Sequence, residues 1–315
     1  MEERKLTPMK FLPDGQDLPW GRVEYRLADL GFVDSMASEG WLGGNTLSDI
    51  MQTYLERVVG ETSFDWYGTQ FPVLVKRLDV KGRTALHVNP DDETAEQRYD
   101  AFGKTALWYV EACGQDACLY LGFRREVKAD EFYRACLEGR VEELLNAVHP
   151  HPGESYLIPP GLVHAAKDVN LLEIAEASEL SFRLHDWERT GRELHLEEAF
   201  DLIDWRAARP SAMQETELLA ATPQFTVHKL QLREPLESHA SEEDSFLIYI
   251  CLKGAAALQL PSRESYQMRK GELLLVPSEV NDFFLLPAAS DTVLLEIRLD
   301  PRPETDIVSE PVEEL

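Results

Sequence analysis

The chain has 315 residues and carries 31 Lys and Arg against 57 Asp and Glu, which gives a formal net charge of −26. This length predicts two or three domains. A large negative charge repels nucleic-acid phosphates and anionic lipid headgroups, so we expect neither a nucleic-acid partner nor a membrane partner. Hydrophobic residues make up 44% of the chain, enough for a substantial core, which argues against general disorder.

The N-terminus and the cysteines predict a cytoplasmic protein. The first residues, MEERKLTPMKF, are charged and contain no apolar signal-peptide core. Because no CxxC pair or zinc-finger spacing occurs, a reduced setting with free thiols is the favoured interpretation. The alternative is a disulfide between Cys113 and Cys118 across a hairpin. The four cysteines are Cys113, Cys118, Cys136 and Cys251.

The first two thirds of the chain alternate between helical and strand patterns. Apolar residues recur at helical spacing over 22–60, although Gly40 to Gly44 interrupt them. Strand-like runs follow from Phe71, and GQD joins two further runs as a predicted hairpin. The spacing over 128–147 again predicts a helix, with Leu137, Val141, Leu144 and Leu145 on its apolar face.

The last third predicts a second β-domain. A polar, irregular stretch near 206–222 marks a boundary, and short strands with Gly and Pro turns follow over 224–300. We therefore expect a mainly β protein with domains at 1–210 and 211–300. The first domain carries helical segments at 22–60 and 128–147, and residues 301–315 form an acidic tail.

An internal similarity links the two domains. The segments 149–166 and 266–284 both run from Gly-Glu through an apolar strand and a Pro-containing turn into a second strand. In cupin-type jelly rolls, this hairpin carries the last metal ligand. The first copy has His164 after the turn, whereas the second has Asn281 or Asp282 nearby. Any metal site is therefore expected in the first domain.

Five polar residues form the candidate site. His87 and Asn89 occupy positions i and i+2 of a predicted strand, so their side chains share one face. Lys104 precedes another strand, His164 follows the Pro-Pro-Gly turn, and Arg183 lies in SFRLHDWER. Their convergence in the mouth of a β-barrel would suit an anionic substrate, with or without a metal.

The chain resembles the type I phosphomannose isomerases in their short bacterial form. The resemblance covers about residues 20–300 and is carried by FPVLVKRLDVKGRTALHVNPDD, GKTALWYV, PGESYLIPPGLVHAA and LLEIAEASELSFRLHDWER. It implies two cupin-like jelly rolls, with a few helices attached to the first. It also implies metal-assisted interconversion of mannose 6-phosphate and fructose 6-phosphate, with an active-site Arg near the end of the first β-domain.

Several positions depart from the family's zinc-ligand pattern of Gln, His, Glu and His. The Gln position is His87, the first His position is Asn89, and the Glu position is Ala106. Only His164 matches. Two histidines without a carboxylate make a poor zinc site, so we expect zinc binding to be weak or absent. Glu173 is a possible substitute that the sequence does not place.

Each site residue also has a simpler interpretation. His87 could be a hydrogen-bonded residue lining the barrel, Asn89 a turn residue before Pro90, and Lys104 a solvated side chain. Arg183 could pair with Asp186 or Glu188. Asp91 and Asp92 are expected to cap a helix. His149 and His151 are expected in an exposed loop.

Two functions follow. The first is a mannose-6-phosphate isomerase-like enzyme with His87 and His164 as metal ligands, Arg183 and Lys104 as catalytic residues, and Lys104, Arg183 and Asn89 as substrate contacts. The alternative is a non-catalytic cupin with a regulatory role that binds a sugar or sugar phosphate. Both imply a small-molecule partner and a monomer or homodimer.

Overall fold

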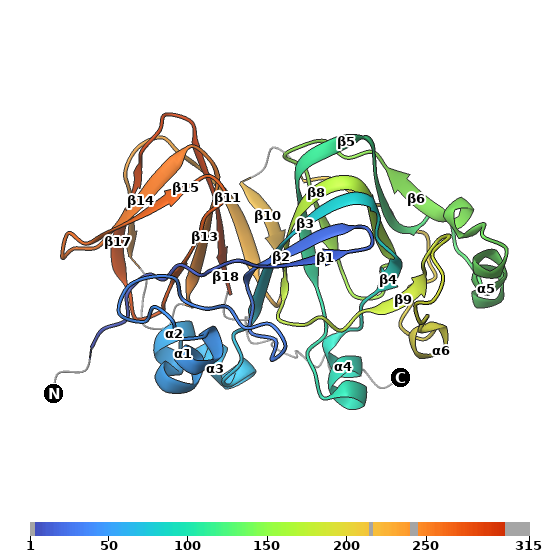
Figure 1. Cartoon of the computed structure of the whole chain (residues 1–315), viewed down its shortest axis with the longest axis horizontal. Helices are drawn as coiled ribbons and strands as arrows, with labels where there is room; N and C mark the ends of the chain where they lie inside the picture. The colour runs from blue at the N-terminus through green and yellow to red at the C-terminus, as the bar shows by residue number, and fades with distance from the viewer. Residues whose placement is uncertain (1–3, 214–216, 240–244, 300–315) are drawn as a thin grey trace, which may run out of the picture.

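The computed structural model describes residues 4–213, 217–239 and 245–299. Two β-rich units stand side by side, with blue to yellow-green strands in one and orange to red strands in the other (Figure 1). The expected acidic tail lies outside the described residues. Among the described residues, none of the helices has the length and apolar character needed to cross a bilayer.

A nine-stranded sheet forms the first unit. Its strands run in the order β1-β2-β3-β8-β4-β9, and β5 pairs with β6, β7 and β8. Long, curved strands β3, β5 and β8 form its centre. The bounds are β1 (Asp14–Leu18), β2 (Gly21–Leu27), β3 (Val73–Arg83), β4 (Leu86–Val88), β5 (Ala106–Phe123), β6 (Leu145–Val148), β7 (Ser155–Ile158), β8 (His164–Glu176) and β9 (Phe182–His185).

The second unit is a sandwich of two sheets with an apolar interior. One sheet has the order β10-β11-β18-β13-β16 and the other β12-β17-β14-β15. The strands are β10 (Leu218–Ala221), β11 (Thr226–Leu232), β12 (Leu236–His239), β13 (Leu247–Lys253), β14 (Ala255–Gln259), β15 (Ser265–Arg269), β16 (Leu273–Val276), β17 (Asp282–Pro287) and β18 (Thr292–Arg298).

Short helices flank both units: α1, α2 and α3 lie beneath the second, where Arg57 of α2 pairs with Glu279, and α4, α5 and α6 lie against the first (Figure 1). A 3-10 turn, η1 (Val141–Leu144), follows α5. In Figure 1, α4 lies beneath β4, and α5 and α6 lie at the end of this unit farthest from the second. The helices are α1 (Leu47–Tyr54), α2 (Glu56–Val59), α3 (Glu61–Tyr67), α4 (Asp92–Tyr99), α5 (Ala129–Leu137) and α6 (Leu196–Ala199).

One apolar core joins the two units. Leu107, Leu172 and Ile174 from the first sheet cluster with Ile248 and Ile297 from the second unit, all at most 4% exposed. Because strand side chains alternate between faces, the opposite face of the same first-unit strands points into that unit's own interior. The candidate site lies on this inner face.

The expectation of a helical segment over 22–60 is wrong for its first half. Residues 21–27 form β2, in which Val23, Tyr25 and Leu27 are buried and alternate with Arg22 and Glu24. This alternation with period two is the signature of a strand with one buried face. The helical spacing is confirmed only from Leu47 onward, in α1, α2 and α3.

The expected GQD hairpin is also wrong, because both runs belong to the single strand β5. Its two halves pair with β8 in succession, and the register shifts between Cys113 and Cys118. A long-range partner therefore keeps this strand continuous where the local sequence suggested a turn. All four cysteines are free, as expected.

The helix expected over 128–147 is confirmed in part. Residues 129–137 form α5 and 141–144 form η1, but Leu145 begins strand β6. Leu137 is 69% exposed, contrary to its expected place on the apolar face. Phe132, Ala135 and Cys136 form the buried face of α5 instead.

The repeated segments are present in both units, but they are not hairpins. Strands β7 and β8 do not pair with each other, and β16 and β17 belong to different sheets of the second unit. The shared connection thus crosses between layers, as in a jelly roll. In the second unit it leads to Asp282, whose carboxylate lies 3.0 Å from the exposed ring of His239.

Candidate functional site

All five predicted site residues line one cavity inside the first unit. The cavity measures about 270 Å³ and contains His87, Asn89, Lys104, His164 and Arg183. Ala106, where the resemblance implies a Glu, also lines it. The further lining side chains are Leu18, Trp20, Val23, Tyr25, Lys76, Leu78, Thr84, Trp108, Glu173, Glu179, Ser181 and Arg192.

Strand pairing brings the two histidines together. His87 on β4 lies opposite His164 at the start of β8, and Arg183 on β9 lies opposite His87 on its other side. The centroids of the two imidazole rings are 6.4 Å apart. The i, i+2 spacing of His87 and Asn89 correctly predicted a shared face, because both line the cavity.

Both imidazoles are uncharged at neutral pH. Burial lowers the pKa of His164 to about 4. Burial, together with His164 and Arg183, holds the pKa of His87 well below its usual range. The Nδ1 atom of His164 lies 2.8 Å from the carbonyl oxygen of Leu162. Since a carbonyl only accepts, this nitrogen carries the proton and Nε2 keeps a lone pair.

Two lysines and two glutamates form a buried ion-pair cluster in the cavity. The Lys76 and Lys104 ammonium groups lie 3.2 and 3.3 Å from Oε1 of Glu173. Lys104 also lies 3.0 Å from Oε2 of Glu179, which contacts Lys76 as well. The indole Nε1 of Trp108 donates to Oε2 of Glu173 at 2.7 Å. We call Lys76, Lys104, Glu173 and Glu179 the ion-pair quartet.

The lysines keep both carboxylates of the quartet charged. Burial alone would raise the pKa of Glu173, but Lys104 and Lys76 outweigh it and hold this pKa well below its usual range. The same lysines lower the pKa of Glu179 to about 2 against the effect of burial. Burial likewise opposes the charge on Lys76, but Glu173 and Glu179 raise its pKa.

Three adjacent strands create the centre of this quartet. Lys76 on β3, Glu173 on β8 and Trp108 on β5 are directly paired in register, so they form one row across the inner face. Sequence reasoning missed Lys76 and Glu179 and named Glu173 without placing it. The available signal was a charged residue within an apolar strand, as in VLVK and LLEI, since such residues are rarely buried without a partner.

Two polar atoms in the cavity wall have no partner among the described residues. Asn89 donates from Nδ2 to the Lys104 carbonyl at 3.3 Å, but its buried Oδ1 accepts from nothing. Arg183 donates from Nη1 to the carbonyl of Glu193 at 2.8 Å, while its buried Nε is unpartnered. Asp186 is engaged by other arginines, Arg189 and Arg192. Arg183 is therefore free to contact a ligand.

The simpler interpretations are settled for several residues. Lys104 is 5% exposed and ion-paired, so the solvated interpretation is wrong. Asp91 caps α4 by accepting from the Thr94 amide, as expected. His149 and His151 are exposed and lie outside the cavity, which confirms the expectation for them.

The cavity offers few metal donors. Among the described residues, no three His, Cys, Asp or Glu side chains are grouped so that they could hold a metal ion. Asn89 adds an amide oxygen to the two imidazoles, whereas Ala106 offers no donor. Glu173 is buried, but it is already bound to two lysines and an indole. It does not complete a ligand set with the histidines.

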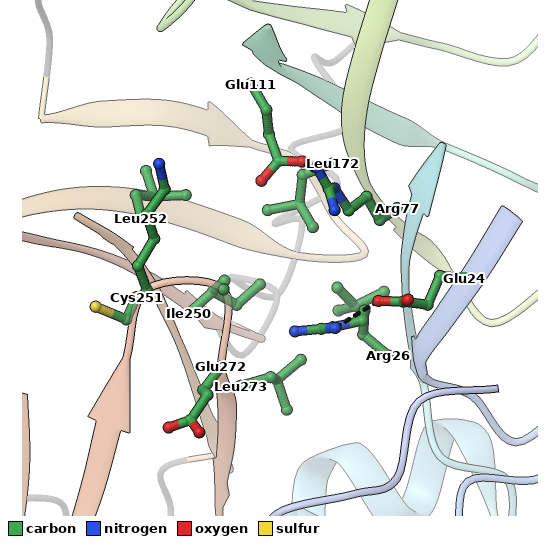
Figure 2. A pocket seen from close by; sticks show the side chains of 13 residues that line it. Glu24, Arg26, Arg77, Glu111, Leu172, Ile250, Cys251, Leu252, Glu272 and Leu273 are labelled. Carbon is green, nitrogen blue, oxygen red and sulfur yellow. Dashed lines mark hydrogen bonds and ion pairs between the residues drawn. The ribbon is translucent and has the colours of Figure 1, made fainter. Parts of the chain in front are cut away.

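A second cavity, of about 410 Å³, lies between the two units. Figure 2 shows Arg26 pointing into it from the first unit, opposite Ile250 and Leu273 of the second. Its arginines already have partners, because Arg26 pairs with Glu24 and the Arg77 Nε lies 2.6 Å from a carboxylate oxygen of Glu111. Among the residues that the structure describes, none of the side chains lining this second cavity has a buried polar atom without a partner, so the first cavity remains the favoured site.

Known proteins match this chain over both units. A family model described as "Mannose-6-phosphate isomerase, cupin domain" matches residues 214–287. "Mannose-6-phosphate isomerase ManA" of Bacillus subtilis is 27% identical over 311 residues, covering 88% of this chain and 95% of that protein.

Two solved structures share the fold. The mannose 6-phosphate isomerase from Bacillus subtilis has a TM-score of 0.79 at 22% identity, covering 93% of this chain and 100% of that one. A mannose 6-phosphate isomerase described as holo and zinc bound has a TM-score of 0.74 at 13% identity, covering 94% and 100%. These likenesses confirm the mainly β, cupin-type fold. Together, the matches confirm the predicted resemblance of this chain to the phosphomannose isomerase family of cupin proteins.

Proposed function

We propose that this protein is a mannose-6-phosphate isomerase-like enzyme that interconverts an aldose and a ketose form of a hexose 6-phosphate in the first-unit cavity. The observation that carries the proposal is the composition of this cavity, where four cationic side chains and two neutral imidazoles surround two fixed carboxylates. On a chain with a net charge of −26, such a local excess of positive charge favours a small anionic substrate. We choose mannose 6-phosphate as the sugar because the relatives are named mannose-6-phosphate isomerases.

In this proposal, Arg183 and Arg192 bind the phosphate group. A guanidinium presents several N–H donors in a plane and pairs well with phosphate oxygens. Asn89 would accept a hydrogen bond from a sugar hydroxyl through its free Oδ1. Lys104 would act indirectly, by holding Glu173 and Glu179 in place, because its ammonium already contacts both carboxylates.

The isomerisation needs one carbon-bound proton to move. A base takes the proton from C2 of the aldose and returns it to C1, while a second proton passes from O2 to O1. Glu173 is the candidate base because it is a buried carboxylate on the cavity wall. His87 and His164 are candidates for the transfer between the oxygens, since a neutral imidazole can both donate and accept.

A second candidate function is ligand binding without turnover. The observation that favours it is the contact of Glu173 with Lys76 and Lys104, which hold the pKa of this carboxylate low. A carboxylate with a strongly lowered pKa is a weak base, so proton abstraction would be slow. Glu173 would then remain charged in the cavity but would be too weak a base to support rapid isomerisation.

One experiment separates these functions. Purified protein is mixed with mannose 6-phosphate, fructose 6-phosphate formation is followed by a coupled assay, and thermal stability is measured in parallel. Turnover that falls at least about tenfold in Glu173→Gln supports the enzyme. A ligand-dependent rise in melting temperature without turnover supports the binding protein. If mannose 6-phosphate causes no turnover and no thermal shift, both proposed functions are contradicted.

The assay also needs a folding control. Glu173→Gln leaves the two lysines with one carboxylate, so its circular dichroism spectrum is compared with that of the wild type. Arg192→Gln removes a phosphate contact outside the quartet and is expected to raise KM with little change in kcat. This split distinguishes a binding role from a structural one.

A further inference from the structure

The cavity wall combines an incomplete metal-ligand set with unsatisfied groups that would suit a sugar. This combination allows an inference that rests on the proposed function and extends it to the way the ligand is held. Three observations contribute: the donors that are present, the engagement of the nearest carboxylate, and the buried atoms without a partner.

The donor set is too weak for zinc. Structural and catalytic zinc sites hold the ion with three or four protein donors, drawn from thiolates, imidazoles and carboxylates. His87 and His164 supply two imidazoles, Asn89 supplies an uncharged amide oxygen, and Ala106 supplies a methyl group. No anionic ligand remains to offset the two positive charges of the ion.

Glu173 cannot supply the missing carboxylate without a large cost. Its Oε1 lies 3.2 and 3.3 Å from two ammonium groups, and its Oε2 accepts from Trp108 at 2.7 Å. Turning Glu173 toward a metal would break these contacts and leave Lys76 and Lys104 sharing only Glu179. Breaking a buried ion pair is strongly unfavourable, because the charge left behind remains desolvated.

The surrounding charges also oppose a dication. Lys104, Arg183 and Arg192 line the same cavity of about 270 Å³ as the two imidazoles. A zinc ion between the imidazoles would be repelled by these cations in a medium that screens poorly. An anionic sugar phosphate would be attracted by the same charges.

The unpartnered atoms are an acceptor and a donor. Oδ1 of Asn89 lacks a hydrogen to accept, and Nε of Arg183 lacks an acceptor. Leaving such buried groups unpaired is unfavourable, because each has lost its hydrogen bonds to water. A hydroxyl group donates one hydrogen bond and accepts others, so sugar hydroxyls can satisfy both atoms.

We infer that this cavity binds its sugar phosphate without a zinc ion: beside the two imidazoles, sugar hydroxyls donate to Oδ1 of Asn89 and accept from Nε of Arg183, while Nη2 of Arg183 and Arg192 bind the phosphate. The lost carboxylate at Ala106 then leaves space on the cavity wall for the sugar. The site differs in this respect from the zinc-bound isomerase that shares its fold.

The test uses the full-length protein, first stripped with EDTA. Zinc chloride and mannose 6-phosphate are each titrated by calorimetry, and mannose 6-phosphate is titrated again with zinc present. We expect mannose 6-phosphate to bind with the same affinity in both cases, and Asn89→Leu to weaken it about tenfold. Zinc binding at one equivalent with submicromolar Kd, or sugar binding that EDTA abolishes and zinc restores, would overturn the inference.

A variant with added metal donors allows zinc affinity to be compared within this same protein. Asn89→His with Ala106→Glu restores two strong donors and is expected to bind zinc at least about 100-fold more tightly than the wild type. Asn89→His with Ala106→Met is the matched control, with similar length at 106 but no oxygen. Equal zinc affinity in the wild type and the restored variant would contradict the argument from the donor set.

The zinc titration tests the metal-donor argument whether or not the protein binds mannose 6-phosphate. If mannose 6-phosphate binds neither the stripped nor the zinc-loaded protein, the proposed function fails. Weak zinc binding by the wild type would still support the donor-set argument in that case, and tight zinc binding would still refute it.

Discussion

At the scale of single residues, the ion-pair quartet determines the chemistry of the cavity. Lys76 and Lys104 each contact both Glu173 and Glu179. Sequence reasoning located His164, Lys104 and Arg183 because they lie in recognisable motifs. It could not locate Lys76, because its partner is set by the pairing of β3 with β8, about 100 residues apart along the chain.

The quartet is expected to be an interdependent unit. Lys76→Met removes one cation and should lower the free energy of unfolding by about 3 to 5 kcal/mol, since it leaves a surplus of buried negative charge. Lys76→Met with Glu179→Gln removes one charge of each sign and should cost less than the sum of the single changes. Urea denaturation measures Lys76→Met, Glu179→Gln and the double variant.

An exposed pair serves as the control for this cycle. Arg134 and Asp130 form an i, i+4 pair on α5 with both side chains mostly exposed. Arg134→Gln should change the free energy of unfolding by no more than about 0.5 kcal/mol. Additive costs within the quartet, or an equally small effect of Lys76→Met, would contradict the account of the cluster.

The buried histidines predict acid lability. The pKa of His164 is lowered to about 4 in the folded protein, so between pH 6.5 and 4 the unfolded chain binds more protons than the folded one. The free energy of unfolding should therefore fall as the pH drops through this window. Below about pH 4.5, Glu179, with its pKa lowered to about 2, extends the loss in the same direction.

Urea denaturation at pH 7, 5.5 and 4 measures this dependence. His87→Gln with His164→Asn should flatten the profile between pH 6.5 and 4. His149→Asn, at an exposed position outside the cavity, should leave it unchanged. If the double variant keeps the wild-type slope, the two imidazoles are not its source.

At the scale of elements, local sequence patterns correctly predicted the strands that end in Gly or Pro turns. They predicted less well the strands that are held by partners distant in the sequence. The short strands of the second unit were expected from their Gly and Pro turns and are present. The continuous strand β5 was missed, because its pairing with β8 overrides the GQD signal. Strand β2 was missed because Leu27 also fits a helical spacing with the leucines that follow it.

The approach of Gly103 to α4 positions Lys104. A Cβ atom on Gly103 would lie 2.5 Å from the backbone of both Asp91 and Asp92, and the Gly103 amide donates to Asp92 at 3.1 Å. Only glycine allows this contact, which holds the Lys104 carbonyl near Asn89.

Gly103→Ala is therefore expected to weaken mannose 6-phosphate binding at least about tenfold and to destabilise the fold by about 1 to 3 kcal/mol. Calorimetry and urea denaturation measure these two effects. Gly82→Ala is the matched control, because the nearest atom to its new Cβ lies 3.9 Å away. Equal behaviour of the two variants would show that the contact at Gly103 does not position the site.

At the scale of the whole molecule, the shared core makes the two units one stability unit. Phe71 of the first unit and Phe246 of the second are both fully buried, with ring centroids 4.7 Å apart. The sequence predicted two β-domains but could not show that an apolar core joins them, because apolar strand residues fit an internal face and an interface equally well. The boundary near residue 210 remains a prediction.

Phe246→Ala should lower the free energy of unfolding by about 3 to 5 kcal/mol, because it opens a cavity in this core. Calorimetry should show a single unfolding transition in both the wild type and the variant, with the variant at lower temperature. Leu236→Ala, at a 43% exposed position on β12, is the control and should have little effect. Two separated transitions in the wild type would contradict one shared core.

We propose above that the first-unit cavity binds a hexose 6-phosphate. The most direct measurement is calorimetric titration of the wild type and Arg183→Gln with mannose 6-phosphate and with mannose. We expect the wild type to bind mannose 6-phosphate far more tightly than mannose, and Arg183→Gln to reduce this preference at least about tenfold. Equal affinity of the wild type for both sugars, or an unchanged preference in Arg183→Gln, would contradict this proposal.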